Sequence, residues 1–275
     1  MISVIICCRH NELLKDQVQN IEDTIGCDHE LVVIDNHDGH HDIFSAYNEG
    51  VRRSHGDILH FRHDDITHIT HDWGKEVEKI LSDPTIGLLG VVGSHVMPGF
   101  PAYYSESPYM SGHNRDNDNG TIIGNDFGYW DKHGIADVAV VDGQQFFIPK
   151  RLFPPLQFDE ERFSGFHGYD MDISLQVQSL GLRVVVSNRV LSVHQWCNSK
   201  WNDSTMLLQL YAAMDIVYDK WKGILPITRG IDKPRVEIDN MMLLWNDAYR
   251  YRTVLKSKAY RLGHRLLSPL RRILH

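Results

Sequence analysis

Residues 56–65 have the sequence Gly56-Asp57-Ile58-Leu59-His60-Phe61-Arg62-His63-Asp64-Asp65. Gly56 marks a turn, and the apolar run after it predicts a short buried β-strand over residues 57–61. Two adjacent carboxylates come soon after this strand. In a sheet whose strands are joined by helices, ligands bind beyond the carboxyl ends of the strands. We therefore expect His63, Asp64 and Asp65 to face a ligand.

The segments on both sides of this stretch alternate between strand and helix patterns. Upstream, residues 3–8 and 31–34 are apolar runs, whereas residues 12–25 and 43–53 carry apolar side chains at helical spacing. The alternation predicts an α/β fold with a single Rossmann-like, mostly parallel sheet flanked by helices. Downstream, the patterns predict helices at 73–81, 169–180 and 204–221 and strands at 86–92, 136–141, 146–149, 182–186 and 190–193. Residues 98–134 lack periodicity, and we expect a long functional loop there.

Length and charge indicate one main domain with a basic appendage. The 275 residues suffice for a single enzyme-sized core over residues 1–222, with residues 223–275 as a linker and a helical extension. The formal charge is 28 minus 36, or −8, and residues 250–275 hold eight Lys and Arg and no acid, so the rest sums to −16. An acidic body suits divalent cations and lacks the basic surface that nucleic acids need. We expect no nucleic-acid partner.

The cysteines and the start of the chain indicate the compartment. Cys7, Cys8, Cys27 and Cys197 contain no CxxC pair, which argues against a disulfide framework or a zinc ribbon. The apolar run at residues 1–8 is too short for a signal h-region or a membrane span. We therefore expect a protein of the reducing cytoplasm.

Several classes of enzyme are disfavoured by missing motifs. No glycine lies between Cys7 and Gly26 in the first crossover, so GxGxxG and Walker A loops are absent. This argues against dinucleotide-dependent redox chemistry, P-loop phosphoryl transfer and sugar nucleotidyl transfer. A metal-dependent hydrolase would need clustered HxH or HExxH ligands, a pattern that the chain's histidines do not form.

Three features, in this order and spacing, resemble family 2 glycosyltransferases of the GT-A fold. They are the strand 31–35 ending in Asp35, the segment Ala46-Tyr47-Asn48-Glu49-Gly50 leading to residues 56–65, and Tyr169-Asp170-Met171-Asp172 with Val193-His194 downstream. The resemblance covers residues 2–220 and is nearest to the branch with a His-Asp-Asp metal motif. It implies that residues 1–222 bind a nucleoside diphosphate sugar and transfer the sugar to an acceptor hydroxyl.

The resemblance implies a metal site, because the charge that appears on the departing diphosphate must be neutralised by Mn²⁺ or Mg²⁺. The last acid of the family's DxD element aligns with Asp65, and a late metal-binding histidine aligns with His194. Asp64 is expected to bind the ribose or the metal, and His63 replaces the first acid. A mixed Asp and His shell favours Mn²⁺. The alternatives are a plain turn for the acids and a structural role for His194.

The resemblance also assigns the catalytic base. An inverting transfer needs a base that takes the proton of the attacking hydroxyl. Asp170 matches the acid that serves this purpose in the family, and the Glu that often precedes it is Tyr169 here. The alternative for Asp170 is an interaction with the helix dipole, which we expect for Asp172.

The nucleotide and the sugar are assigned in the same way. Asp35, the backbone at Cys8 and Arg9, and Asp64 would bind the nucleotide. An acid accepts a hydrogen bond from the N3–H of a pyrimidine, so UDP is expected, with dTDP as the alternative. Asp142 and Gly143 would contact the donor sugar, or else form a plain turn.

The tail leaves two interpretations open. Leu255, Ala259, Leu262, Leu266, Leu270 and Ile273 recur at helical spacing among basic residues. Such a helix either lies on an anionic membrane, at the inner face where lipid-linked acceptors occur, or packs on protein. The donor sugar and the glycan or lipid-linked acceptor are set by residues 98–134 and stay open. A non-catalytic nucleotide-sugar-binding protein is the alternative to an enzyme, because His63 and Tyr169 replace acids.

Overall fold

A seven-stranded sheet forms the centre of the computed structural model, which describes residues 1–9, 11–118, 120–195 and 204–232 and positions 237, 240, 243, 244 and 247. Its strand order is β10 (Ile135–Asp137), β13 (Arg183–Ser187), β5 (Ile86–Gly90), β12 (Gln145–Pro149), β3 (Ile58–Arg62), β1 (Ile2–Cys8) and β2 (His29–Asp35). β1 is parallel to β2 and β3, and β13 is parallel to β5. β12 runs antiparallel to both its neighbours. The α/β prediction is confirmed, but the sheet is mixed rather than mostly parallel.

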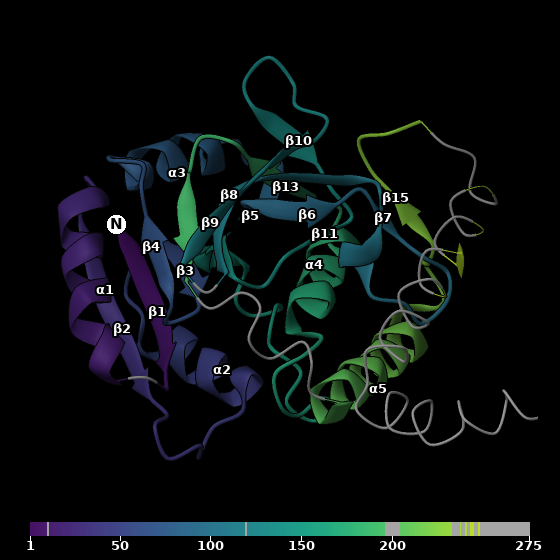
Figure 1. Ribbon diagram of the computed structural model, residues 1–275, viewed down its shortest axis with the longest axis horizontal. Helices are drawn as coiled ribbons and strands as arrows, with labels where there is room; N and C mark the ends of the chain where they lie inside the picture. Colours follow the sequence, from purple (N-terminus) through teal and green to yellow (C-terminus); the bar gives the residue numbers. More distant parts are fainter. Residues whose placement is uncertain are drawn as a thin grey trace, which may run out of the picture.

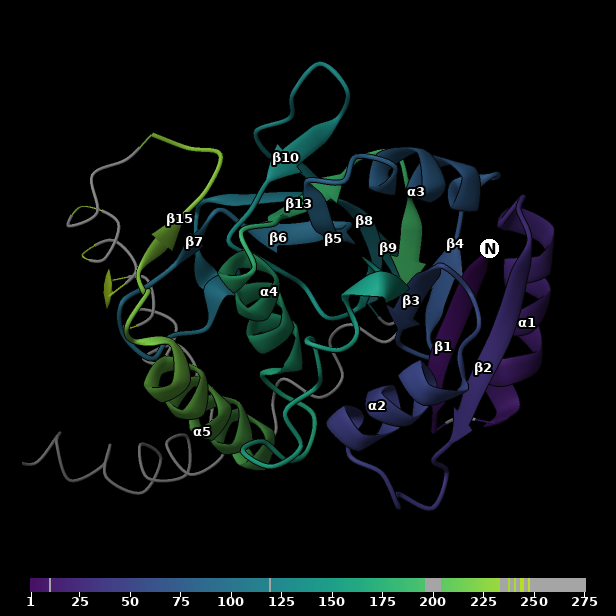
Figure 2. The same cartoon turned by 180° about the vertical axis from the view of Figure 1, so that it is seen from behind.

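In the described part of the chain, five helices cover the two faces of this sheet: α1 (Asn11–Thr24), α2 (Ile43–Arg53), α3 (Trp73–Leu81), α4 (Tyr169–Ser179) and α5 (Ser204–Trp221). One core joins α2, α4 and α5 to one face, and a second core joins α1 and α3 to the other. Figures 1 and 2 show α2, α4 and α5 along the same side of the molecule.

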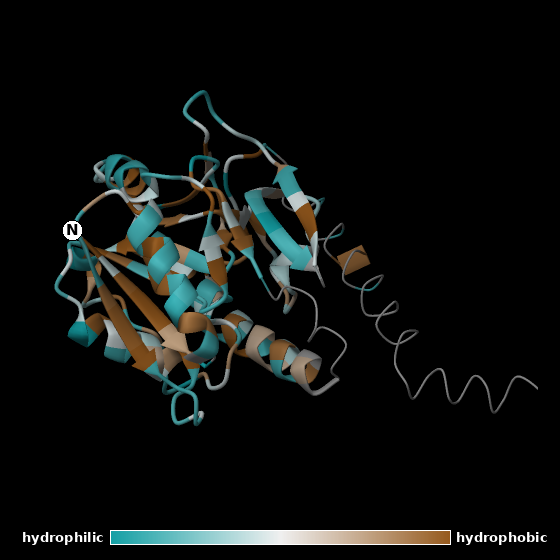
Figure 3. Ribbon diagram, turned by 60° about the vertical axis from the view of Figure 1, so that its left-hand side comes forward, coloured by the Kyte–Doolittle hydropathy of each residue, from teal (hydrophilic) through white to brown (hydrophobic). Residues whose placement is uncertain are grey.

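Alternation along β1 explains why the sheet has two cores. Ile5 packs into the core of α2 and α4, whereas Val4 and Ile6 pack into the core of α1 and α3. Successive side chains of a strand point to opposite faces, and a strand that is covered on both faces is apolar throughout. The central strands are accordingly coloured largely as hydrophobic in Figure 3.

A second sheet crosses the carboxyl edge of the first. Its strand order is β11 (Val140–Val141), β6 (Val92–Ser94), β8 (Met110–Asp118), β14 (Ser192–His194) and β4 (Ile66–His68), and β9 (Thr121–Phe127) pairs with β8. β7 (Val96–Met97) pairs with β15 (Ile227–Thr228), and two 3-10 turns are η1 (Tyr104–Glu106) and η2 (Lys150–Leu152). The antiparallel pairing of β14 with β4 sets His194 opposite Ile66, directly after Asp65.

Two sequence expectations are corrected here. The segment 98–134 contains the β8–β9 hairpin as well as loops, and the strand expected over 136–141 is divided between β10 and β11, which belong to different sheets. The β9 strand is largely exposed, so it lacks the alternation by which buried strands are recognised.

The start of the expected linker packs on the domain, because Leu225 and Ile227 are buried and β15 pairs with β7. Apart from isolated positions, the basic extension lies outside the described residues. No helix in the described part of the chain is long and apolar enough to cross a membrane.

Candidate active site

A cavity of about 790 Å³ lies beyond the carboxyl ends of β1 and β3 and beneath the second sheet. Its walls include Arg9, Asp64, Asp65, Asp142, Gly143, Asp170 and His194, which are all of the residues assigned from the sequence except Cys8 and Asp35. They come from segments that lie far apart in the chain. The fold therefore gathers most of the expected site in one place.

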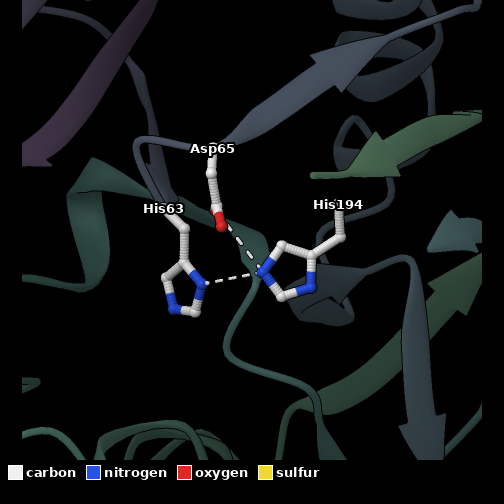
Figure 4. A group of neighbouring side chains, drawn as sticks. All are labelled: His63, Asp65 and His194. Carbon is white, nitrogen blue, oxygen red and sulfur yellow. Dashed lines mark hydrogen bonds and ion pairs between the residues drawn. The ribbon is translucent and has the colours of Figure 1, made fainter. Parts of the chain in front are cut away.

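Three side chains in this cavity form a group that could hold a metal ion: His63, Asp65 and His194. One ligand atom from each lies within 4.8 Å of the other two. His194 Nε2 lies 3.4 Å from Asp65 Oδ1 and 3.5 Å from His63 Nδ1. Figure 4 shows the three side chains pointing toward one another from the loop after β3 and from β14.

The donor atoms of this group suit a divalent cation. Asp65 Oδ1 is buried, and its 3.4 Å contact with His194 Nε2 falls short of a well-formed hydrogen bond, so a cation would satisfy it. Burial alone would raise the pKa of Asp65, but His194, His63 and Arg62 outweigh it and lower that pKa to about 2. Burial lowers the pKa of His63 to about 4, so its ring is neutral, as a metal ligand must be. Two imidazoles and one carboxylate are a donor set that divalent transition metals accept.

His63 is a candidate ligand that the sequence analysis missed. It stands where the family's first acid is expected, and the sequence analysis gave it no metal-binding role. The sequence could have indicated this role, because a histidine next to two acids is itself a common metal ligand.

Arg62 holds the loop that carries these ligands. It is fully buried at the end of β3 and donates hydrogen bonds to the carbonyl oxygens of His63, at 3.1 Å, and of Ile66. Burial lowers its pKa to about 10, so the guanidinium stays charged at neutral pH and offsets the charges of Asp64 and Asp65. The two ends of the loop are thereby fixed before any ligand binds.

Asp64 connects this loop to the end of β1. Its Oδ2 accepts a hydrogen bond of 2.7 Å from the backbone N–H of Arg9. β1 and β3 are neighbouring parallel strands, so the loops after them meet at the same edge. Arg9 and Asp64, which were both assigned to the nucleotide, thus lie in direct contact.

Asp170, which is buried, and Asp142, which is half-buried, line the same cavity. Tyr104 in η1 donates its hydroxyl to Asp170 Oδ2 at 2.8 Å, and that hydroxyl lies 3.4 Å from Asp142 Oδ2. Burial first, and then the charge of Asp142, raise the pKa of Asp170 to about 7. Burial likewise raises the pKa of Asp142. A carboxylate that titrates near neutrality is suited to act as a general base.

Tyr104 was not assigned from the sequence, because nothing distinguishes it there from the other aromatic residues of its segment. Asp172, expected to be structural, contacts Lys220 Nζ at 2.9 Å and accepts a bond of 2.7 Å from Trp221 Nε1. It therefore joins α4 to α5 and faces away from Asp170.

The two remaining predicted residues lie outside the cavity wall. Cys8 is fully buried, and its carbonyl oxygen accepts the backbone N–H of Asn36 at 2.8 Å. Asp35 has 65% of its side chain exposed and contacts His37 Nδ1 at 2.8 Å. Their assignment to the nucleotide stays a prediction.

Comparisons with known proteins identify the family and the fold of this chain. A family model described as "Glycosyltransferase like family" matches residues 3–220, whereas no protein of curated function matches the chain significantly. The crystal structure of GalNAc-T7 with UDP, GalNAc and Mn²⁺ superposes with a TM-score of 0.54 at 12% identity, over 90% of this chain and 54% of that one. This chain thus spans about half the length of that protein.

A second solved structure is the mannosyltransferase PcManGT from Pyrobaculum calidifontis in complex with GDP-Man and Mn²⁺. It superposes with a TM-score of 0.50 at 12% identity, over 97% of this chain and 84% of that one. At such identities the similarity shows the fold alone. Together with the family match, it establishes that this chain belongs to the glycosyltransferase-like family and has the GT-A fold.

Proposed function

We propose that this protein is a metal-dependent, inverting glycosyltransferase that uses a UDP-linked sugar and an acceptor hydroxyl. The observation that carries the proposal is that the cation-binding group and a buried carboxyl with a pKa of about 7 line the same cavity. A protein that only binds a nucleoside diphosphate would not need a buried carboxyl group that titrates near neutrality.

The proposed division of work follows from where the groups lie. His63, Asp65 and His194 would hold a divalent cation, which neutralises the charge on the leaving diphosphate. Arg62 keeps their loop in place, and Asp64 keeps it against the end of β1. The nucleotide would lie along Arg9 toward Asp35 and the backbone of Cys8.

Asp170 is the proposed base. In its ionised form it would accept the proton of the acceptor hydroxyl as that oxygen attacks the anomeric carbon. Tyr104 orients the carboxylate by donating to one of its oxygens. Asp142 and Gly143, which lie beside Asp170 in the cavity, would contact the donor sugar.

The partners and location are part of the same proposal. The acceptor would be a glycan or a lipid-linked saccharide, and nucleic acid would not be a partner. The protein would act in the cytoplasm, with the basic extension as a contact to the inner face of the membrane.

A thermal-shift panel of UDP, dTDP and GDP, each with and without Mn²⁺, tests the metal and the nucleotide together. A ligand at 100 times its dissociation constant adds about 2.7 kcal/mol of stability, which is expected to raise Tm by several degrees. We expect the largest shift with UDP and Mn²⁺ combined. Equal shifts with and without Mn²⁺ would contradict the metal site, and a larger shift with GDP would contradict the UDP assignment.

Transfer itself is tested by replacing the base. Asp170→Asn should retain the shift with UDP and Mn²⁺ but lose sugar transfer, and NMR of the wild-type product should show an inverted anomeric centre. Full transfer by this variant would remove Asp170 from its role, and a retained configuration would contradict the inverting mechanism.

A further inference from the structure

Tyr169 places its hydroxyl between His63 and the chain at Gly143. The Tyr169 oxygen lies 2.8 Å from His63 Nε2 and 3.0 Å from the carbonyl oxygen of Gly143. Tyr169 is 3% exposed, and its ring packs edge-on against those of Phe44 and Tyr47 at 6.2 and 5.7 Å. The hydroxyl therefore has a fixed position in the cavity wall.

The direction of these hydrogen bonds follows from the groups involved. A carbonyl oxygen can only accept, so the single hydroxyl hydrogen of Tyr169 goes to Gly143. The hydroxyl oxygen is then left as an acceptor toward His63. The His63 ring must donate from Nε2, and the other nitrogen of a neutral imidazole then carries no hydrogen.

That other nitrogen is the one that faces the metal-binding group. His63 Nδ1 lies 3.5 Å from His194 Nε2, and Asp65 offers an oxygen within 4.8 Å of both rings. In Figure 4 this nitrogen points toward His194 while Nε2 points away from the group. Metal-binding histidines generally donate their second ring N–H to an outer partner, which fixes the tautomer and the ring orientation.

Gly143 makes this arrangement possible. A Cβ atom at this position would lie only 2.2 Å from the Tyr169 hydroxyl oxygen, so any other residue would displace the hydroxyl. Because Gly143 has no side chain, the Tyr169 hydroxyl can come close enough to donate a hydrogen bond to the Gly143 carbonyl oxygen.

We propose that Tyr169 is a positioning residue that holds His63 in the tautomer whose Nδ1 binds the metal ion. This inference rests on the proposed metal site. It assigns a role to a residue that has no contact with the ion, the nucleotide or the sugar in the proposed function.

The first test measures Mn²⁺ binding without nucleotide, by the EPR signal of free Mn²⁺. Tyr169→Phe removes the hydroxyl and keeps the ring, and we expect its Mn²⁺ affinity to fall by about 10- to 100-fold, as for other outer partners of metal-binding histidines. Tyr47→Phe is the matched control, because Tyr47 is equally buried and its hydroxyl has no hydrogen-bond partner among the described residues. Its affinity should equal that of the wild type. In a His63→Ala background, Tyr169→Phe should cause no further loss.

The second test observes the tautomer in the metal-free protein, by long-range ¹H–¹⁵N NMR of the histidine rings. Wild-type His63 should carry its proton on Nε2, and Tyr169→Phe should show a mixture of the two tautomers. A proton on Nδ1 in the wild type, or an unchanged Mn²⁺ affinity in Tyr169→Phe, would overturn the inference while leaving the metal site intact. Absence of Mn²⁺ binding by the wild type would instead overturn the metal site, and this inference with it.

Discussion

Removal of the Tyr104 hydroxyl should move the pH dependence of sugar transfer. Tyr104 donates to Asp170 at 2.8 Å and so favours the ionised carboxylate, which is the form that acts as a base. A hydrogen bond to a charged group contributes about 1.5–3 kcal/mol, and each pKa unit corresponds to about 1.4 kcal/mol. Tyr104→Phe should therefore raise the pKa of Asp170 from about 7 to about 8 or somewhat higher.

This shift has a definite consequence for the rate. Activity rises with pH as the base ionises, so the acidic limb of kcat/KM should lie near 7 in the wild type and about one unit higher in Tyr104→Phe. At pH 7 the ionised fraction would drop from about one half to about one tenth, a loss of roughly fivefold. At pH 9 Asp170 should be almost fully ionised in both proteins, so this cause of a rate difference should disappear.

The assay is kcat/KM for the donor sugar between pH 5.5 and 9 at saturating Mn²⁺. Tyr47→Phe, which removes a buried hydroxyl that bonds to none of the described residues, serves as the control and should keep the wild-type profile. If the acidic limb of Tyr104→Phe stays where it is in the wild type, Asp170 is not the group whose ionisation limits the reaction, and the assignment of the base is wrong.

Three further changes separate the metal, the base and the scaffold. Asp65→Asn should abolish the Mn²⁺-dependent part of the thermal shift with UDP, and a wild-type shift would exclude Asp65 as a ligand. The folded-state pKa of Asp170 is raised, so ionising it destabilises the fold, by an amount that increases from about pH 4 to about pH 7 and reaches about 4 kcal/mol. Asp170→Asn should therefore raise Tm more at pH 8 than at pH 5. The opposite order in calorimetry would contradict the raised pKa. Lys220→Met leaves Asp172 buried without a cation and Asp159 with Arg162 alone, and should cost about 3–5 kcal/mol in urea unfolding, while Mn²⁺ affinity is kept. A loss of affinity would show that this network supports the metal site.

Much of the fold follows from local patterns in the sequence. β1, β3 and β5 are apolar runs covered on both faces, and their alternation with helices was enough to predict the α/β architecture. Whether β12 runs parallel or antiparallel to its neighbours could not be predicted, because a run of apolar residues looks the same for both orientations of the strand. The β8–β9 hairpin was not predicted, because β9 is solvent-exposed and lacks an apolar pattern. The sequence Asn119-Gly120 is nevertheless a common signal for a hairpin turn.

Some residues of the site could likewise be predicted from the sequence, and others could not. Asp65 and His194 lie 129 positions apart, and only the motif order could connect them before the structure placed them 3.4 Å apart. The hydroxyl contacts of Tyr104 and Tyr169 depend on tertiary packing, which no spacing along the chain encodes. Asp35 was assigned by its place at a strand end, which sets its backbone position but not the direction of its side chain.

The most direct test of the metal site is a crystal grown with UDP and Mn²⁺ and measured at the manganese absorption edge. We predict one anomalous peak bonded to His63 Nδ1, Asp65 and His194 Nε2, with the diphosphate beside it in the cavity. A peak elsewhere, or UDP bound away from these three side chains, would contradict the proposed function at its centre.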